Sequence, residues 1–405
     1  MHLKSVSIYF FFNIINAILP IVTLPFFTRY LTPDDFGTLT VFNIACMITA
    51  VLFRMEINTV LKRQSVESKE SLTRYLSTAF VFSNFLLLTG ALLIGVASFV
   101  IPSWNKGLTL WASMVLMISY SRFHTVNLHH LFQINNRAFV YGLWGLLVTL
   151  GSFGGAFILL SVTSLKWEAR AWADLLVAAI ALIPAVYFLR KEYALSWKFD
   201  WNTLKDTLRF SLPLLPGSFI SYLFMVSDRL FLAELVGPKE LGLYSVAIQL
   251  SSAVTLILGA LLPPWESWLF NLKGGITAGN IDKILTRFLL VLAAMVLVMF
   301  GLPKILEWVL PFITSKDFSN ARLYLLPTIA SATAAGLFAL LLPILTYLRR
   351  TTIIAAVHVV MLLINFGVLY PYIKWWGTAG AAYAVVTSYV VGGVGLILFM
   401  RKSVR

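Results

Sequence analysis

About twelve long apolar runs, each near or above the roughly 20 residues that a helix needs to cross a bilayer, fill almost all of this 405-residue chain. Hydrophobic residues make up 59% of the sequence and charged residues only 12%, whereas about a quarter of the residues in soluble domains are charged. The mean hydropathy of +0.86 agrees with this imbalance. The sequence therefore excludes a water-soluble fold and predicts an all-α, polytopic membrane protein.

We expect about twelve transmembrane helices joined by short loops. The first apolar run is too long for a signal peptide and lacks a cleavage site, so we expect it to remain in the mature chain. The predicted helices span residues 5–31, 36–60, 75–101, 108–131, 139–163, 169–189, 209–235, 241–270, 284–310, 322–348, 351–373 and 378–400.

The basic residues predict how the chain is oriented in the membrane. An even number of spans places both termini on one side. Of the 31 Lys and Arg residues, 19 lie on that side, nine lie on the opposite side and three lie within the helices. Because cytoplasmic loops carry the Lys and Arg excess, both termini are predicted to be cytoplasmic. The net charge of +14 therefore indicates topology, and it does not indicate a nucleic-acid partner.

One short segment of the chain occurs twice. The segment 31–39 (LTPDDFGTL) recurs as 236–244 (VGPKELGLY), with proline, an acidic residue, a large apolar residue and glycine all offset by 205 positions. Both copies follow the first helix of a six-helix half. Such parallel repeats commonly form a binding site between their halves. The sequence predicts a half at 1–189, a cytoplasmic linker at 190–208 and a second half at 209–405.

Charged residues within the predicted helices are the candidate functional residues, because a charge at mid-helix costs about 2.5 to 3.5 kcal/mol on insertion scales. Arg122 lies near the middle of its helix, where its forked guanidinium suits a diphosphate group. A structural ion pair with a carboxylate from another helix is the alternative. Seven residues share this placement: Arg54, Glu56, Arg122, Asp174, Asp228, Arg229 and Glu266.

Several of these residues have more than one interpretation. Arg54 lies near a helix end, where its side chain can extend toward the interface instead of binding substrate. Asp228 and Arg229 are about 100° apart around a helix and cannot both face one partner. Four side chains could carry protons or couple transport to an ion, or could instead be packed or interfacial: Asp174, Glu266, His124 and His358. Glu56 is a further candidate for ion coupling.

The chain resembles one family of membrane proteins. The similarity is carried by TRYLTPDDFG at 28–37, SDRLFL at 227–232, LGLYS at 241–245 and GTAGAA at 377–382. These motifs resemble those of the lipid-linked O-antigen repeat-unit flippases, in the polysaccharide-transporter branch of the MOP superfamily. The resemblance implies a V-shaped bundle with two six-helix halves. It also implies that Asp228 and Arg229 occupy a recurrent position, with Arg229 contacting substrate or another helix and Asp228 acting as its structural support or as a proton site.

The resemblance implies that the protein moves an undecaprenyl-diphosphate-linked oligosaccharide from the cytoplasmic to the periplasmic leaflet of a bacterial inner membrane. Its implied partners are membrane lipids, a polysaccharide polymerase and a chain-length regulator. The related lipid II flippases carry two additional C-terminal helices, for which this chain has no room. Ion-coupled multidrug or small-molecule antiport is the alternative. That branch typically needs an acidic residue in its first helix, where this chain has Asn13 and Asn16.

An enzyme is the third interpretation. We find no phosphate-binding loop, no zinc-ligand pattern and no other catalytic motif, so no cofactor or metal is predicted. Membrane polymerases and ligases acting on the same sugars need a large periplasmic loop, but the longest outer connection here is only about residues 311–321. The sequence therefore favours transport over synthesis.

Overall fold

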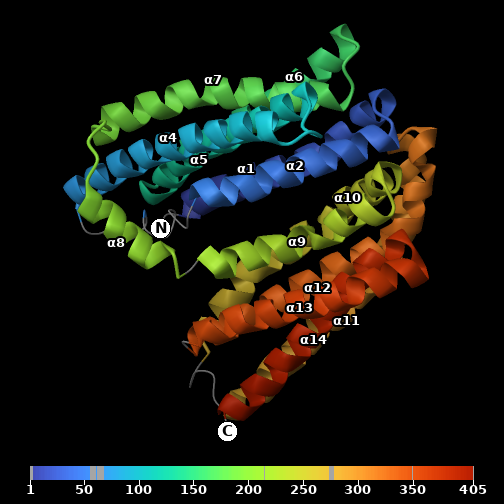
Figure 1. Cartoon of the computed structure of the whole chain (residues 1–405). Coiled ribbons are helices and arrows are strands. Elements are labelled where there is room, and N and C mark those ends of the chain that lie inside the picture. The colour runs from blue at the N-terminus through green and yellow to red at the C-terminus, as the bar shows by residue number, and fades with distance from the viewer. Residues whose placement is uncertain are drawn as a thin grey trace. The chain divides into compact units, whose positions relative to one another are not determined.

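The computed structural model describes residues 3–54, 61, 68–213, 215–272, 278–348 and 350–404, and in them it contains thirteen α-helices, one 3-10 helix and no β-strand. The helices have these bounds: α1 Leu3–Tyr30, α2 Pro33–Arg54, α4 Lys69–Val100, α5 Lys106–Ile134, α6 Ala138–Val162, α7 Trp167–Tyr193, α8 Trp201–Ser211, α9 Leu215–Leu235, α10 Pro238–Phe270, α11 Ala278–Ile313, η1 Lys316–Ala321, α12 Arg322–Tyr347, α13 Thr351–Trp376 and α14 Thr378–Val404 (Figure 1).

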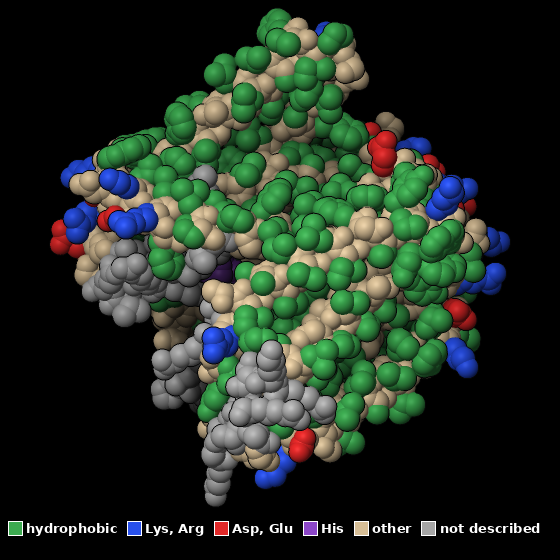
Figure 2. Space-filling model, turned by 60° about the horizontal axis from the view of Figure 1, so that its bottom comes forward, with side chains coloured by type: hydrophobic (Ala, Val, Ile, Leu, Met, Phe, Trp, Pro, Cys, Tyr) green, Lys and Arg blue, Asp and Glu red, His purple; other side chains and the backbone are tan. Residues whose placement is uncertain are grey.

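Most of these helices suit a bilayer. Among the described residues, ten are long and apolar enough to cross a membrane, and α8 with α9 can supply an eleventh span. Helix α5 is long enough at 29 residues, but it carries Arg122 and several histidines. Large hydrophobic side chains such as Phe99 and Leu297 remain exposed. Hydrophobic side chains cover most of the face in Figure 2, and charged side chains gather toward its edges. The predicted all-α polytopic membrane fold is confirmed.

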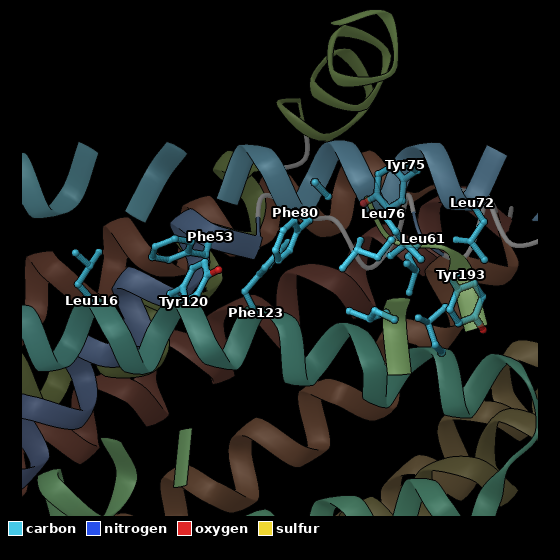
Figure 3. Close-up of a cluster of buried hydrophobic side chains, with 14 residues drawn as sticks. Phe53, Leu61, Leu72, Tyr75, Leu76, Phe80, Leu116, Tyr120, Phe123 and Tyr193 are labelled. Atoms are coloured by element: carbon cyan, nitrogen blue, oxygen red, sulfur yellow. The ribbon is translucent and has the colours of Figure 1, made fainter. Parts of the chain in front are cut away.

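The chain divides into two compact units. Unit 1 comprises Met1–Thr23 and Val41–Phe219, and unit 2 comprises Leu24–Thr40 and Ile220–Arg405. In unit 1, α5 packs against α4, α6 and α7. Buried aromatic residues such as Tyr75, Phe80 and Phe123 fill the layer between α4 and α5 (Figure 3). In unit 2, α12 packs against α10, α11 and α14, and α13 packs against α14.

The repeated segments lie against each other within unit 2. A methyl group added at Gly37 would lie 2.6 Å from the carbonyl carbon of Pro238, and one added at Gly242 would lie 2.7 Å from the carbonyl carbon of Pro33. Proline 33 begins α2 and Pro238 begins α10, so each glycine faces the opposite helix start. Glycine is required at both positions because it has no Cβ, and a side chain at either position would prevent the two backbones from approaching this closely.

A hydrogen bond continues this symmetry one turn further along. The Thr40 hydroxyl donates to Ser245 Oγ at 2.9 Å, and these residues are 205 positions apart. The same offset relates the two copies of the repeated segment. Equivalent atoms of the two copies therefore meet each other, as they do beside a pseudo-twofold axis. The sequence repeat thus corresponds to a structural one.

Several helix boundaries differ from the sequence prediction, and two of these differences have an identifiable local cause. The helix expected to start at residue 209 is instead divided into α8, which ends at Ser211, and α9, which begins at Leu215. Pro213 lies at this break. Proline has no N–H to donate and its ring clashes with the preceding turn, so it interrupts a continuous helix. Helix α4 begins six residues earlier than expected, after Ser68 caps it by accepting a hydrogen bond from the Ser71 amide at 3.0 Å.

Candidate functional site

Three helices of unit 1 bring together a charged cluster around Asp174. Arg122 on α5 places Nη2 3.7 Å from one carboxylate oxygen, and Arg170 on α7 places Nε 3.4 Å from the other. Ser152 on α6 donates a short hydrogen bond to the same carboxylate. The structure thus pairs two of the predicted site residues, Arg122 and Asp174.

The two arginines of this cluster differ in exposure. The side chain of Arg122 is 39% exposed, whereas the side chain of Arg170 is 14% exposed and that of Asp174 is 5% exposed. The Arg170 guanidinium also lies 3.8 Å from the centre of the Phe153 ring, a favourable cation–π distance. Arg170 is therefore the inner partner of the carboxylate. Arg122 extends from the cluster toward more open space.

The cluster has an unbalanced charge. Two guanidinium groups share one carboxylate, and arginine remains protonated in proteins. At 3.7 Å, the contact between Arg122 and Asp174 is an ion pair and not a hydrogen bond. Arg122 thus retains donors for an anion while Asp174 holds its charge in place. An incoming phosphate would complete the neutralisation of the cluster.

Sequence reasoning missed Arg170, because it is only the second residue of the predicted helix 169–189 and does not stand out as a mid-helix charge. Its spacing of four residues from Asp174 was the available signal, because residues four apart lie on one face of a helix. Helix α7 begins at Trp167. Arg170 therefore lies within the helix and can reach the carboxylate.

Other predicted residues of unit 1 lie elsewhere. Arg54 is the last residue of α2 and is half-buried, whereas Glu56 falls outside the described residues. His124 is buried, and its Nε2 lies 3.2 Å from the Ser83 hydroxyl. The rings of Phe80, Tyr120 and Phe123 surround it. A role of these residues in transport stays a prediction.

In unit 2, Asp228 on α9 is buried and has both carboxylate oxygens engaged. One accepts a hydrogen bond from the Tyr244 hydroxyl at 2.8 Å, and the other accepts from the Arg229 amide at 2.8 Å. The neighbouring Ser227 donates to Asn365 on α13 at 2.8 Å. Asp228 thus fixes α9 to α10 through Tyr244. The supporting role of Asp228 stays a prediction.

The remaining predicted residues of unit 2 are separate. His358 on α13 places Nδ1 2.7 Å from the carbonyl oxygen of Ile354 and packs edge-on against Phe338. Glu266 is half-buried near the end of α10. Neither side chain takes part in an ion pair with another described residue. Their proposed part in ion coupling stays a prediction.

A cavity of about 260 Å³ lies beside Asp228, between α9, α10, α12 and α14. Its wall contains one guanidinium, one phenol and several hydroxyl groups, from Arg229, Tyr389, Ser251, Ser252, Thr328 and Ser331. The hydroxyl groups were not predicted as a site, because serine and threonine occur along every helix and no local pattern marks the ones that converge. Among the described residues, no three His, Cys, Asp or Glu side chains form a metal-binding group.

Solved structures define the class of fold. The chain resembles the lipid II flippase MurJ in an inward closed conformation, with a TM-score of 0.74 and 14% identity over 96% of this chain and 86% of that one. It resembles an inward-facing MATE multidrug resistance transporter of the MOP superfamily, with a TM-score of 0.66 and 13% identity over 96% and 94% of the two chains. It also resembles a MOP superfamily transporter from Pyrococcus furiosus, with a TM-score of 0.63 and 14% identity over 99% of this chain and 95% of that one.

The chain therefore shares the fold of these transporters, and it is a multi-pass membrane protein. The family model described as "Polysaccharide biosynthesis protein" matches residues 2–263. Because this match covers more than half of the chain, the protein belongs to the polysaccharide biosynthesis protein family. A comparison with curated proteins gives no match.

Proposed function

We propose that the protein is a flippase that moves an undecaprenyl-diphosphate-linked oligosaccharide, such as an O-antigen repeat unit, across the bacterial inner membrane by alternating access. Membership of the polysaccharide biosynthesis family supports a lipid-linked sugar as substrate. The fold that this chain shares with a lipid II flippase supports translocation. The observation that carries the proposal is the half-exposed Arg122 within a membrane-spanning chain, held beside Asp174 and a second arginine.

The charged cluster of unit 1 explains how a diphosphate could leave the aqueous phase. Removing an anion from water is strongly unfavourable unless a fixed positive charge replaces the hydration shell. Arg122 can donate two parallel hydrogen bonds to a phosphate, and its charge does not depend on pH near neutrality. Asp174 and Arg170 position this group and keep the net charge positive. Arg54 is a further candidate contact for the same diphosphate.

The direction of transport follows from the proposed topology. The excess of Lys and Arg on the side of the termini supports cytoplasmic termini, and transport would then run from the cytoplasmic to the periplasmic leaflet. There a polysaccharide polymerase and its chain-length regulator would use the product. Reporter fusions after Arg405 and within residues 315–320 should give opposite localisation. Equal localisation of the two fusions would contradict the proposed twelve-span topology.

Substitutions of Arg122 test its role in transport. Arg122→Gln removes the charge, and Arg122→Lys keeps the charge but loses the forked geometry. Two-point recognition predicts that both variants export poorly, with glutamine the worse of the two. Arg137→Gln is the matched control, because Arg137 is an exposed arginine of the same unit that pairs with Glu192 at 2.5 Å in the connection after α5. Export should be compared at equal membrane abundance. Normal export by Arg122→Gln would contradict the proposed phosphate contact.

Ion-coupled antiport of a small molecule is the second candidate. The observation that favours it is a buried carboxylate in each unit, Asp174 and Asp228, because intramembrane carboxylates commonly carry protons or bind cations in transporters. Under this alternative, deletion would leave the lipid-linked sugar fully exported and would raise sensitivity to a toxic small molecule. The flippase proposal predicts instead that the lipid-linked unit accumulates, unpolymerised, at the cytoplasmic face.

A further inference from the structure

We propose that the hydroxyl-lined cavity of unit 2 binds one sugar ring of the transported molecule. This inference rests on the proposed function and assigns the sugar to a different part of the chain from the diphosphate. The cavity is lined by residues of α9, α10, α12 and α14, and all of these lining residues belong to unit 2. Its chemistry, its size and its aromatic wall each point to a saccharide.

The serine hydroxyls of the cavity have hydrogen atoms that are already engaged. Ser252 donates to the carbonyl oxygen of Gln249 at 2.6 Å, and Ser331 donates to that of Thr328 at 2.9 Å. Each hydroxyl oxygen has two lone pairs in addition to its hydrogen. These residues therefore present hydrogen-bond acceptors to the cavity. A ligand rich in O–H groups can donate hydrogen bonds to these oxygens.

The same wall also offers donors. Within the described residues, neither the Arg229 guanidinium nor the Tyr389 hydroxyl makes a side-chain hydrogen bond or ion pair, and both groups line the cavity. Arginine has only donors, and a phenol can donate as well as accept. Sugar ring oxygens, hydroxyl oxygens, acetamido carbonyls and carboxylates all accept such hydrogen bonds. The cavity thus matches a ligand that both donates and accepts, as a sugar does.

Two aromatic rings form a further part of the cavity wall. Phe224 and Tyr389 both line the cavity, and their ring centres lie 5.1 Å apart in an edge-to-face arrangement. An aromatic face is apolar over its surface, and it can pack against the C–H face of a pyranose while hydroxyl groups bind the ring edge. An entirely apolar ligand would leave the Arg229 guanidinium and the Tyr389 hydroxyl without hydrogen-bond partners, at a free-energy cost. The combination therefore favours a saccharide over an apolar drug.

The volume limits the size of the occupant. Pockets for drug-sized ligands span about 300 to 1,000 Å³, and this cavity, at about 260 Å³, lies just below that range. It suits one hexose or N-acetylhexosamine and excludes a whole oligosaccharide. The position of the other sugars is not constrained by this cavity. One sugar ring would be bound here, whereas the other sugars of the oligosaccharide could differ.

Binding of two lipids to the purified full-length protein in nanodiscs tests this inference. One probe is undecaprenyl diphosphate, and the other is the same lipid with one N-acetylhexosamine attached. The test variant combines Ser331→Ala with Tyr389→Phe, which removes two hydroxyl groups and keeps both side-chain positions filled. Thr387→Val is the matched control, because this α14 hydroxyl donates to the Tyr383 carbonyl oxygen at 2.9 Å but does not line the cavity.

The expected result is a selective loss of affinity for the glycosylated lipid. Each lost hydrogen bond should weaken its binding about two- to tenfold, while binding of undecaprenyl diphosphate alone stays at the wild-type value. The Thr387→Val variant should match the wild type for both lipids. If the double variant binds both lipids as tightly as the wild type, the sugar site is wrong and the flippase proposal still stands. If the wild type binds neither lipid, the proposed function fails as well.

Discussion

A single methyl group added where the starts of α2 and α10 meet should destabilise the protein. In Gly37→Ala, the new carbon would lie 2.6 Å from the Pro238 carbonyl carbon and even closer to its oxygen. Carbon atoms in contact are normally about 3.5 to 4.0 Å apart, so the two helix starts would have to separate by roughly 1 Å. Because the neighbouring atoms belong to the backbone, no side-chain rotation can relieve this contact.

The magnitude follows from two opposing effects. Overpacking typically costs about 1 to 3 kcal/mol, and replacing a helical glycine by alanine offsets up to about 1 kcal/mol of this. We therefore expect Gly37→Ala, and likewise Gly242→Ala, to lower the free energy of unfolding by about 1 to 2 kcal/mol. The double variant should lose less than the sum, because one separation of the helices relieves both contacts.

Thermal unfolding of detergent-purified protein, followed by tryptophan fluorescence, measures this loss. Gly259→Ala is the matched control because Gly259 lies on the same helix as Gly242 and an added methyl would meet no atom within 4 Å. We expect the control to unfold at or slightly above the wild-type temperature and both crossing variants to unfold several degrees below it. Equal stability of Gly37→Ala and Gly259→Ala would refute the close approach of the two helix starts.

Two further predictions concern charged side chains. Asp174→Asn should lower the free energy of unfolding by about 3 to 5 kcal/mol, because it leaves Arg170 buried beside Arg122 without a counter-charge. The yield of folded protein in the membrane measures this loss. A yield equal to that of the wild type would contradict the prediction. Asp200 caps α8, and a hydrogen bond from Thr203 lowers the pKa of its carboxyl group. Its stabilisation of α8 is therefore complete above the unfolded-state pKa and is lost as the pH falls through the lowered value. Hydrogen exchange of the Asn202 amide, corrected for intrinsic rates, should become faster in acid, and in Asp200→Ala it should be fast at every pH.

The sequence predicts the helices well because each has to satisfy a physical requirement of length and apolarity that is independent of its neighbours. The repeated proline and glycine also predicted a structural repeat, and their contact explains why glycine is needed twice. The break before α9 was harder to predict. Pro213 and Pro216 both fit a kinked helix as well as a divided one, so the local sequence does not distinguish the two.

The candidate site was only partly predictable. Insertion cost identifies Arg122, Asp174, Asp228 and Arg229 as unusual residues, but it does not say which of them meet. The pairing of Arg122 with Asp174 depends on how α5 packs against α7. The cavity in unit 2 was not visible at all, because its wall combines ordinary serine and threonine residues from four separate helices. Their convergence is a property of the fold and not of any local pattern.

Translocation by the purified protein tests the proposed function most directly. The protein is reconstituted into liposomes that hold an undecaprenyl-diphosphate-linked oligosaccharide in both leaflets, and an enzyme that modifies the sugar is added only outside. Without a flippase, about half of the lipid should be modified, because exchange of a charged lipid between leaflets is slow. We predict that the wild-type protein allows nearly complete modification, that Arg137→Gln does so equally, and that Arg122→Gln leaves about half protected. Protection of half of the lipid by correctly folded wild-type protein, under every ion gradient applied, would contradict the flippase proposal.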